Sequence, residues 1–133
     1  MRRAVQAPTD IALLADFFDR YGAALTSGDV AAVARCYALP GMVVADSYSF
    51  TFSTPAAVAL SFLGAAPSYR EQRIVAAHAQ LLDVRQLSEA LIMVTVDWEY
   101  LADDGGALTG EQYHYLLRTD GGGPRITTVV ATR

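Results

Sequence analysis

The chain has no lysine, a single cysteine and no long hydrophobic run. All ten basic residues are arginine, and Schiff-base catalysis needs a lysine amine, so that mechanism is excluded for the side chains. Cys36 alone cannot form an intramolecular disulfide. No apolar run reaches the roughly 18 residues of a membrane span, and no apolar segment follows the N-terminal arginines as it would in a signal peptide. We therefore expect a soluble, cytoplasmic protein.

An excess of positive charge is also lacking. The net charge is −4 and the arginines are scattered, which argues against nucleic acid as a partner. Because no apolar run is long enough to span a membrane, we expect no membrane partner either. The glycine-rich turns lack the strand-to-helix setting of a phosphate loop, and the two histidines have no partner at metal-ligand spacing, so we expect no cofactor and no metal. At 133 residues the chain is expected to form one domain over residues 1 to 133, with its core from about 9 to 132.

The first half of the chain shows helical periodicity. Ile11, Leu14, Phe18, Tyr21 and Leu25 recur every three or four residues, which predicts an amphipathic helix from Thr9 to Leu25 with Tyr21 pointing inward. Gly28 and Asp29 are typical of the end of one helix and the start of the next, and Thr54 before Pro55 predicts a third helix that ends near residue 65.

The second of these helices is expected to place Val33 and Tyr37 on one face and to end at Pro40 and Gly41. Residues 42 to 52 then alternate as in a strand, which puts Asp46, Tyr48, Phe50 and Phe52 on one side. A carboxylate is thus expected in aromatic surroundings.

Four more strands are predicted at about 73 to 84, 90 to 102, 107 to 119 and 125 to 132. In the strand at 90 to 102, alternation places on the inward face Ile92, Val94, Val96, Trp98 and Tyr100. In the strand at 107 to 119, it places there Glu111, Tyr113, Tyr115 and Leu117. Strands this long must twist and curl. The predicted fold is α+β, a cone in which a curved antiparallel sheet wraps around three N-terminal-half helices.

This order of elements, together with the segment RYGAALTSGD at the end of the first helix, resembles the nuclear transport factor 2-like superfamily over about residues 9 to 132. That superfamily includes ketosteroid isomerases and SnoaL-like polyketide cyclases, and its fold is cystatin-like. The resemblance implies a homodimer formed through the outer face of the sheet.

The resemblance also implies roles for individual residues. Tyr21 matches the catalytic hydrogen-bond donor of the isomerases, and Asp46 matches their general base if one extra residue is allowed between Leu39 and Gly41. Tyr113 stands where the isomerases carry a protonated aspartic acid, a departure that keeps a hydrogen-bond donor but argues against steroid isomerisation. Val94, Val96 and Trp98 would lie on the pocket wall.

Each candidate has a structural alternative. Tyr21 could fill the core with its hydroxyl on a backbone carbonyl, Asp46 could be a turn residue, and Glu111 could be a solvated residue rather than a second acid or base. His78 lies where both strand faces are apolar, and His114 is expected opposite the tyrosines. Cys36 is expected in the core.

We expect a mostly apolar pocket for a small apolar ligand, lined by Phe50, Val94, Val96, Trp98, Glu111 and Tyr115. If the protein is an enzyme, Asp46, Tyr21 and Tyr113 would perform acid/base chemistry on a hydrophobic carbonyl compound, as an isomerase, dehydratase or cyclase does. The alternative is a non-catalytic ligand-binding or dimeric association domain.

Overall fold

The computed structural model describes residues 11–63 and 65–132, and within them it contains four helices and six strands. In chain order these are α1 (Ile11–Ser27), α2 (Val30–Arg35), β1 (Tyr37–Ala45), β2 (Ser49–Phe52), α3 (Pro55–Ser61), α4 (Ala65–Glu71), β3 (Ile74–Gln86), β4 (Leu91–Ala102), β5 (Ala107–Thr119) and β6 (Pro124–Ala131).

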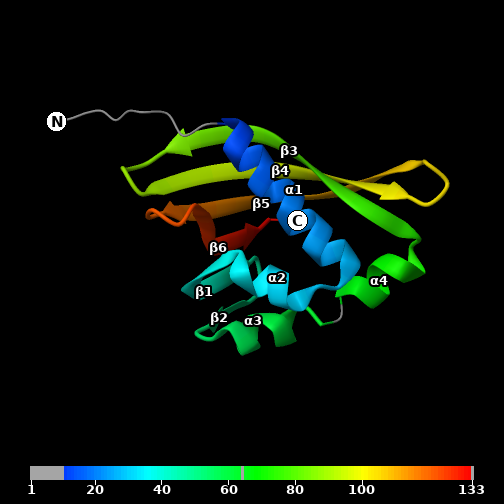
Figure 1. Cartoon of the computed structure of the whole chain (residues 1–133), viewed down its shortest axis with the longest axis horizontal. Helices are drawn as coiled ribbons and strands as arrows, with labels where there is room; N and C mark the ends of the chain where they lie inside the picture. The colour runs from blue at the N-terminus through cyan, green and yellow to red at the C-terminus, as the bar shows by residue number, and fades with distance from the viewer. Residues whose placement is uncertain (1–10, 64, 133) are drawn as a thin grey trace.

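The strands form one sheet in the order β2-β1-β6-β5-β4-β3. The β1–β6 pair is parallel and the other neighbouring pairs are antiparallel. The long strands curve, and α1 lies across the sheet on one face, with α2, α3 and α4 at its side (Figure 1). The α+β fold with a curved sheet is therefore confirmed.

Helix α1 packs against the sheet through the predicted stripe, in which Leu14, Phe18 and Tyr21 are buried. Its predicted start at Thr9 lies outside the described residues. Gly22 allows the helix to approach the sheet closely, because a Cβ atom there would lie 3.0 Å from the ring of Trp98 and 3.2 Å from the carbonyl oxygen of Ala77. The helix ends at Ser27, and the next residue, Gly28, has a φ of 76°, which suits glycine.

The second helix is shorter than predicted. Asp29 caps it as expected, since its side chain accepts a hydrogen bond from the Ala32 N–H, but α2 ends at Arg35. Tyr37 therefore belongs to β1, and Pro40 and Gly41 lie inside that strand rather than after a helix. The Ile126 N–H donates to the Cys36 carbonyl at 2.7 Å, so pairing with β6 outweighs the local helical spacing.

Residues 42 to 52 do not form one strand. The chain reverses between β1 and β2, where the Ala45 N–H donates to the Tyr48 carbonyl at 2.8 Å. Asp46 lies in this turn and is exposed. The third helix starts at Thr54 and Pro55 as predicted, but it ends at Ser61, and α4 follows as a helix that was not predicted.

The four long strands agree with the prediction to within two residues at each end. On β4, Ile92, Val94, Val96 and Trp98 are all buried, as alternation indicates. His114 lies on the opposite face from the tyrosines, where its Nδ1 is 3.0 Å from the Thr95 hydroxyl. The curvature of these strands leaves a hollow between their inner face, α1 and the β1–β2 hairpin.

Candidate functional site

All seven tyrosines of the chain line a single cavity of about 270 Å³. They come from α1, α4, the β1–β2 hairpin and the strands β4 and β5, so they meet only in the folded protein. The tyrosines are Tyr21, Tyr37, Tyr48, Tyr69, Tyr100, Tyr113 and Tyr115. Phe50, Phe62, Trp98 and several aliphatic side chains complete the wall, together with Ser61 and Glu111.

The inner part of the cavity contains a pair of buried hydroxyls. The Oη atoms of Tyr21 and Tyr37 are 2.7 Å apart, and each residue is only 3% exposed. Burial raises the pKa of Tyr21 well above its usual value, and burial also raises the pKa of Tyr37. Both phenols are therefore neutral hydrogen-bond donors at ordinary pH.

Two hydroxyls carry two hydrogens, and only one of them can lie between the two oxygens. The second hydrogen has no acceptor in the described part of the chain. It is consequently available to a ligand oxygen.

Trp98 and Tyr115 fix the sheet side of this region. The Trp98 Nε1–H donates to the Tyr115 hydroxyl at 2.9 Å, and both residues are buried. The ring of Tyr115 lies 6.2 Å from that of Tyr21 and 5.0 Å from that of Phe18. Because each ring contacts others, the inner wall is held in one arrangement by packing as well as by hydrogen bonds.

The outer part of the cavity carries Glu111, the one charged side chain among the lining residues that the structure describes. The Tyr100 hydroxyl donates to its Oε1 at 3.0 Å, and the ring of Tyr69 from α4 lies 5.6 Å from the ring of Tyr100. Burial, followed by the charge of Glu111, raises the pKa of Tyr113 to about 12. Tyr113 is thus also a neutral donor.

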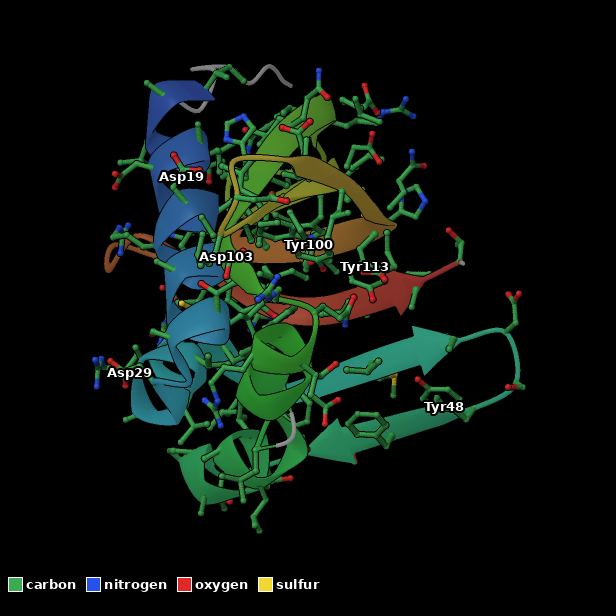
Figure 2. All side chains as sticks on the ribbon, turned by 90° about the vertical axis from the view of Figure 1, so that its right-hand side faces the viewer. Asp19, Asp29, Tyr48, Tyr100, Asp103 and Tyr113 are labelled. Atoms are coloured by element: carbon green, nitrogen blue, oxygen red, sulfur yellow. The ribbon has the colours of Figure 1, made fainter. Side chains whose placement is uncertain are left out.

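Tyr48 and Phe50 of the β1–β2 hairpin face the strands β4 and β5 across the cavity. Their rings are stacked with centroids 6.2 Å apart, and Phe52 connects them to Tyr37. Figure 2 shows Tyr48 on the hairpin and Tyr100 and Tyr113 on the strands opposite it. Tyr48 is 57% exposed and Phe50 is 40% exposed, so the cavity reaches solvent on this side.

Six of the predicted site residues come together at the cavity: Tyr21, Phe50, Trp98, Glu111, Tyr113 and Tyr115. Val94 and Val96 do not, since they are completely buried in the core beneath the wall. The expected position of Asp46 on the aromatic face is wrong, because the turn directs it into solvent and it is not a lining residue.

Tyr37, Tyr69 and Phe62 are cavity residues that were not predicted as site residues. Tyr37 was assigned to the core face of a helix, and Tyr69 lies in a helix that periodicity did not indicate. Tyr100 was placed on the inward face but not in the site. For Tyr37 and Tyr100 the predicted inward face was the available signal, whereas no pattern in the sequence indicated Tyr69.

The described residues contain no group of three or more histidine, cysteine, aspartate or glutamate side chains that could hold a metal ion. Of the two histidines, His78 is exposed, with its Nδ1 4.0 Å from an Asp19 carboxylate oxygen, and His114 lies outside the cavity. Among the helices described, none is long and apolar enough to cross a membrane.

The model of one protein family, NTF2-like protein (DUF6841), matches residues 12–133. The chain belongs to this NTF2-like family. No curated protein matches the sequence at a significant level.

Solved structures share the fold of this NTF2-like chain at low sequence identity. A domain with a cystatin-like fold from Nostoc punctiforme has a TM-score of 0.69 and 12% identity, covering 96% of this chain and 79% of its own. A ketosteroid isomerase-like protein from Erwinia carotovora has a TM-score of 0.65 and 16% identity, covering 95% and 97%. A putative calcium/calmodulin-dependent protein kinase II association domain from Xanthomonas campestris has a TM-score of 0.61 and 16% identity, covering 98% and 91%. These similarities establish the fold and not the chemistry.

Proposed function

We propose that this protein binds a small, uncharged, mostly apolar molecule that carries a carbonyl or phenolic oxygen. The observation that carries the proposal is the gathering of all seven tyrosines around one cavity, with the Tyr21 and Tyr37 hydroxyls paired in its inner wall. Aromatic walls with a few polar groups are typical of small-molecule sites.

The ligand oxygen would accept the hydroxyl hydrogen that the Tyr21–Tyr37 pair leaves free. The volume of about 270 Å³ is near the lower end of ligand pockets, which favours a molecule of one or two rings. Among the described residues, Glu111 is the only charged one that lines the cavity, so an anionic ligand would be repelled.

Fluorescence titration with naphthol tests this proposal. The double variant Tyr21→Phe and Tyr37→Phe, which removes both hydroxyl hydrogens, should weaken binding about fivefold, which is the effect of one neutral hydrogen bond. Thr128→Val, which removes a hydroxyl from a residue that does not line the cavity, should leave the affinity unchanged. Equal binding of naphthalene sulfonate, or full affinity in the double variant, would count against the proposal.

Acid/base catalysis on a carbonyl compound is a second candidate, favoured by the position of Glu111 beside Tyr100 and Tyr113. Glu111 would remove a proton from the carbon next to the carbonyl, and the inner hydroxyl pair would stabilise the enolate oxygen. The role that the family resemblance gives to Asp46 passes to Glu111 in this proposal, because Asp46 does not line the cavity.

We also propose a homodimer, as the likeness to an association domain suggests. The outer face of the sheet carries Met93 opposite Leu116, and Thr95 opposite His114. A second copy would cover these partly apolar residues. Light scattering of Leu116→Glu against the unchanged chain tests this: a dimer that becomes a monomer supports the interface, and an unchanged monomer contradicts it.

A further inference from the structure

Two hollows outside the tyrosine-lined cavity meet at Arg35 and Arg125. The first, of about 310 Å³, lies between α1, α2 and the β5–β6 turn, and Arg20 also borders it. The second is a groove between α2 and α3 of about 790 Å³. The first shares no lining residue with the tyrosine-lined cavity, and the groove shares only Tyr37.

Three arginines line the first hollow, Arg20, Arg35 and Arg125, and only two of them form ion pairs with carboxylates. Arg20 pairs with Asp16 at 3.0 Å on the surface of α1, and Arg125 pairs with Asp120 at 3.1 Å. Arg35 has no carboxylate partner among the described residues. Its guanidinium is therefore free to bind an anion.

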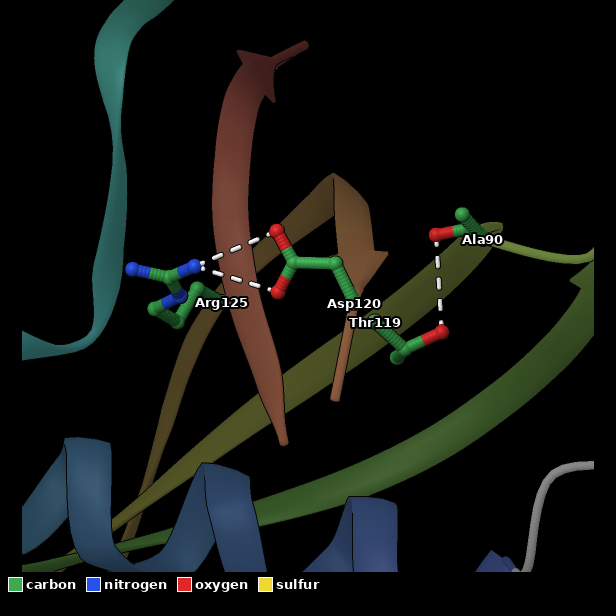
Figure 3. A network of polar contacts seen from close by, with 4 residues as sticks. All are labelled: Ala90, Thr119, Asp120 and Arg125. Atoms are coloured by element: carbon green, nitrogen blue, oxygen red, sulfur yellow. Dashed lines mark hydrogen bonds and ion pairs between the residues drawn. The ribbon is translucent and has the colours of Figure 1, made fainter. Parts of the chain in front are cut away.

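Arg125 has unused donors as well. Its Nη2 contacts both oxygens of Asp120, whereas its other terminal nitrogen points away from that carboxylate (Figure 3). Its Nε is buried without a hydrogen-bond partner in the described part of the structure. A guanidinium is suited to two parallel hydrogen bonds with an oxyanion, and here the Asp120 carboxylate satisfies only one nitrogen.

The local charge indicates which oxyanion fits. Three arginines against Asp16 and Asp120 leave one positive charge, in a chain whose net charge is −4. A carboxylate would neutralise that charge, whereas a phosphate dianion would leave the site negative.

The groove beside Arg35 and Arg125 is apolar. Its walls are formed by small and aliphatic residues, namely Ala31, Ala34, Leu39, Pro55, Ala56 and Ala59. Because four of these are alanines, the groove has room for an alkyl chain next to the guanidinium groups.

We propose that the arginines Arg20, Arg35 and Arg125 and the adjoining α2–α3 groove form a second binding site, specific for an aliphatic carboxylate. The carboxylate binds Arg35 and Arg125 in the hollow that Arg20 also lines, and the alkyl chain lies in the groove. This site is independent of the ligand proposed for the tyrosine-lined cavity.

Isothermal titration calorimetry with octanoate tests the site. Octanoate should bind, while acetate, which lacks the chain, and octanol, which lacks the charge, should bind much more weakly. Arg35→Gln should weaken octanoate binding about tenfold, as expected for a hydrogen bond to a charged group. Arg85→Gln is the matched control, because Arg85 lies on the edge strand β3 and lines neither hollow.

Further variants distinguish this site from the cavity. Arg35→Lys keeps the positive charge but loses the paired donors of the guanidinium, so its affinity for octanoate should lie between that of Arg35→Gln and that of the unchanged chain. Tyr21→Phe should leave octanoate binding unchanged.

The proposal is overturned if Arg35→Gln binds octanoate as well as the unchanged chain, if Tyr21→Phe abolishes binding, or if octyl phosphate binds more tightly than octanoate. Far-ultraviolet circular dichroism of Arg35→Gln shows whether it is folded, and Arg125→Gln repeats the test at the second guanidinium.

Discussion

The hydroxyls of Tyr21 and Tyr37 meet 2.7 Å apart inside the protein, although the two residues are 16 positions apart in the sequence. Tyr21 comes from the middle of α1 and Tyr37 from the first position of β1. Their rings are in edge contact at 6.0 Å, and Tyr21 also contacts the rings of Trp98 and Tyr115. The pair therefore joins the helix, the hairpin strand and the long strands at one point.

Removal of one of these two hydroxyls should destabilise the protein, because the other hydroxyl is then buried without a hydrogen-bond partner. Tyr37→Phe leaves the buried Tyr21 hydroxyl without a partner, so the free energy of unfolding should fall by about 1 to 2 kcal/mol. In the double variant Tyr21→Phe and Tyr37→Phe no polar atom is left unpaired, and the loss should be smaller than the sum of the single losses. Urea denaturation of the four proteins measures this coupling; additive losses would show that the hydroxyls do not interact.

Gly22→Ala should destabilise the protein despite a better helix propensity. Alanine in an exposed helix position is favoured over glycine by about 1 kcal/mol. At Gly22, however, the new methyl group would be 3.0 Å from the Trp98 ring and 3.2 Å from the Ala77 carbonyl oxygen, so α1 must move away from the sheet. We expect a net loss of about 1 to 2 kcal/mol by urea denaturation. An increase in stability would show that α1 is not packed this closely.

The tyrosine cluster should make the protein sensitive to alkali. The pKa of Tyr113 is about 12 in the folded protein, against about 10 in an unfolded chain, so the unfolded state loses its proton first. Its contribution to stability is complete below about pH 10 and is lost as the pH rises through about 12. Tyr21 and Tyr37, whose pKa values are also raised by burial, act in the same direction.

Glu111→Gln tests how much the Glu111 charge contributes to the raised pKa of Tyr113. Burial is the main reason for the raised pKa of Tyr113, and the Glu111 charge is the second. The variant should therefore lower the pKa of Tyr113 without returning it to the usual value. NMR titration of isotope-labelled tyrosine rings follows each phenol separately, and Asp104→Asn on the β4–β5 turn serves as a control for loss of a carboxylate. An unchanged Tyr113 titration in Glu111→Gln would contradict the proximity of the two groups.

The sequence predicted the parts of the site that depend on regular alternation. The β4 and β5 strands are long and keep one face buried, so Trp98, Tyr113 and Tyr115 were placed correctly from spacing alone. The start of α2 was also predictable, because the Asp29 side chain caps it through a local hydrogen bond from the Ala32 N–H. The α+β cone follows from these elements.

The errors lie where tertiary hydrogen bonds override the local pattern. Tyr37 fits a helical face, but its backbone neighbours pair with β6, and this moves its side chain into the cavity. Asp46 fits the alternation of residues 42 to 52 only if that segment is continuous, and the reversal after Ala45 breaks the alternation. Val94 and Val96 have the correct face, but whether a side chain lies beneath the wall or lines it depends on the curvature of the sheet.

A catalytic base at Glu111 and a catalytic base at Asp46 predict opposite effects for substitution of these two residues. If Glu111 removes protons from a bound carbonyl compound, the protein should accelerate exchange of the methyl hydrogens of acetophenone in deuterium oxide, since that exchange requires proton removal beside the carbonyl. Glu111→Gln should remove the acceleration, while Asp46→Asn should retain it, because Asp46 is exposed and does not line the cavity. NMR measures the rate of exchange directly. Loss of exchange in Asp46→Asn with retention in Glu111→Gln would return the base to Asp46, and absence of exchange with acetophenone bound would favour a cavity that binds without catalysis.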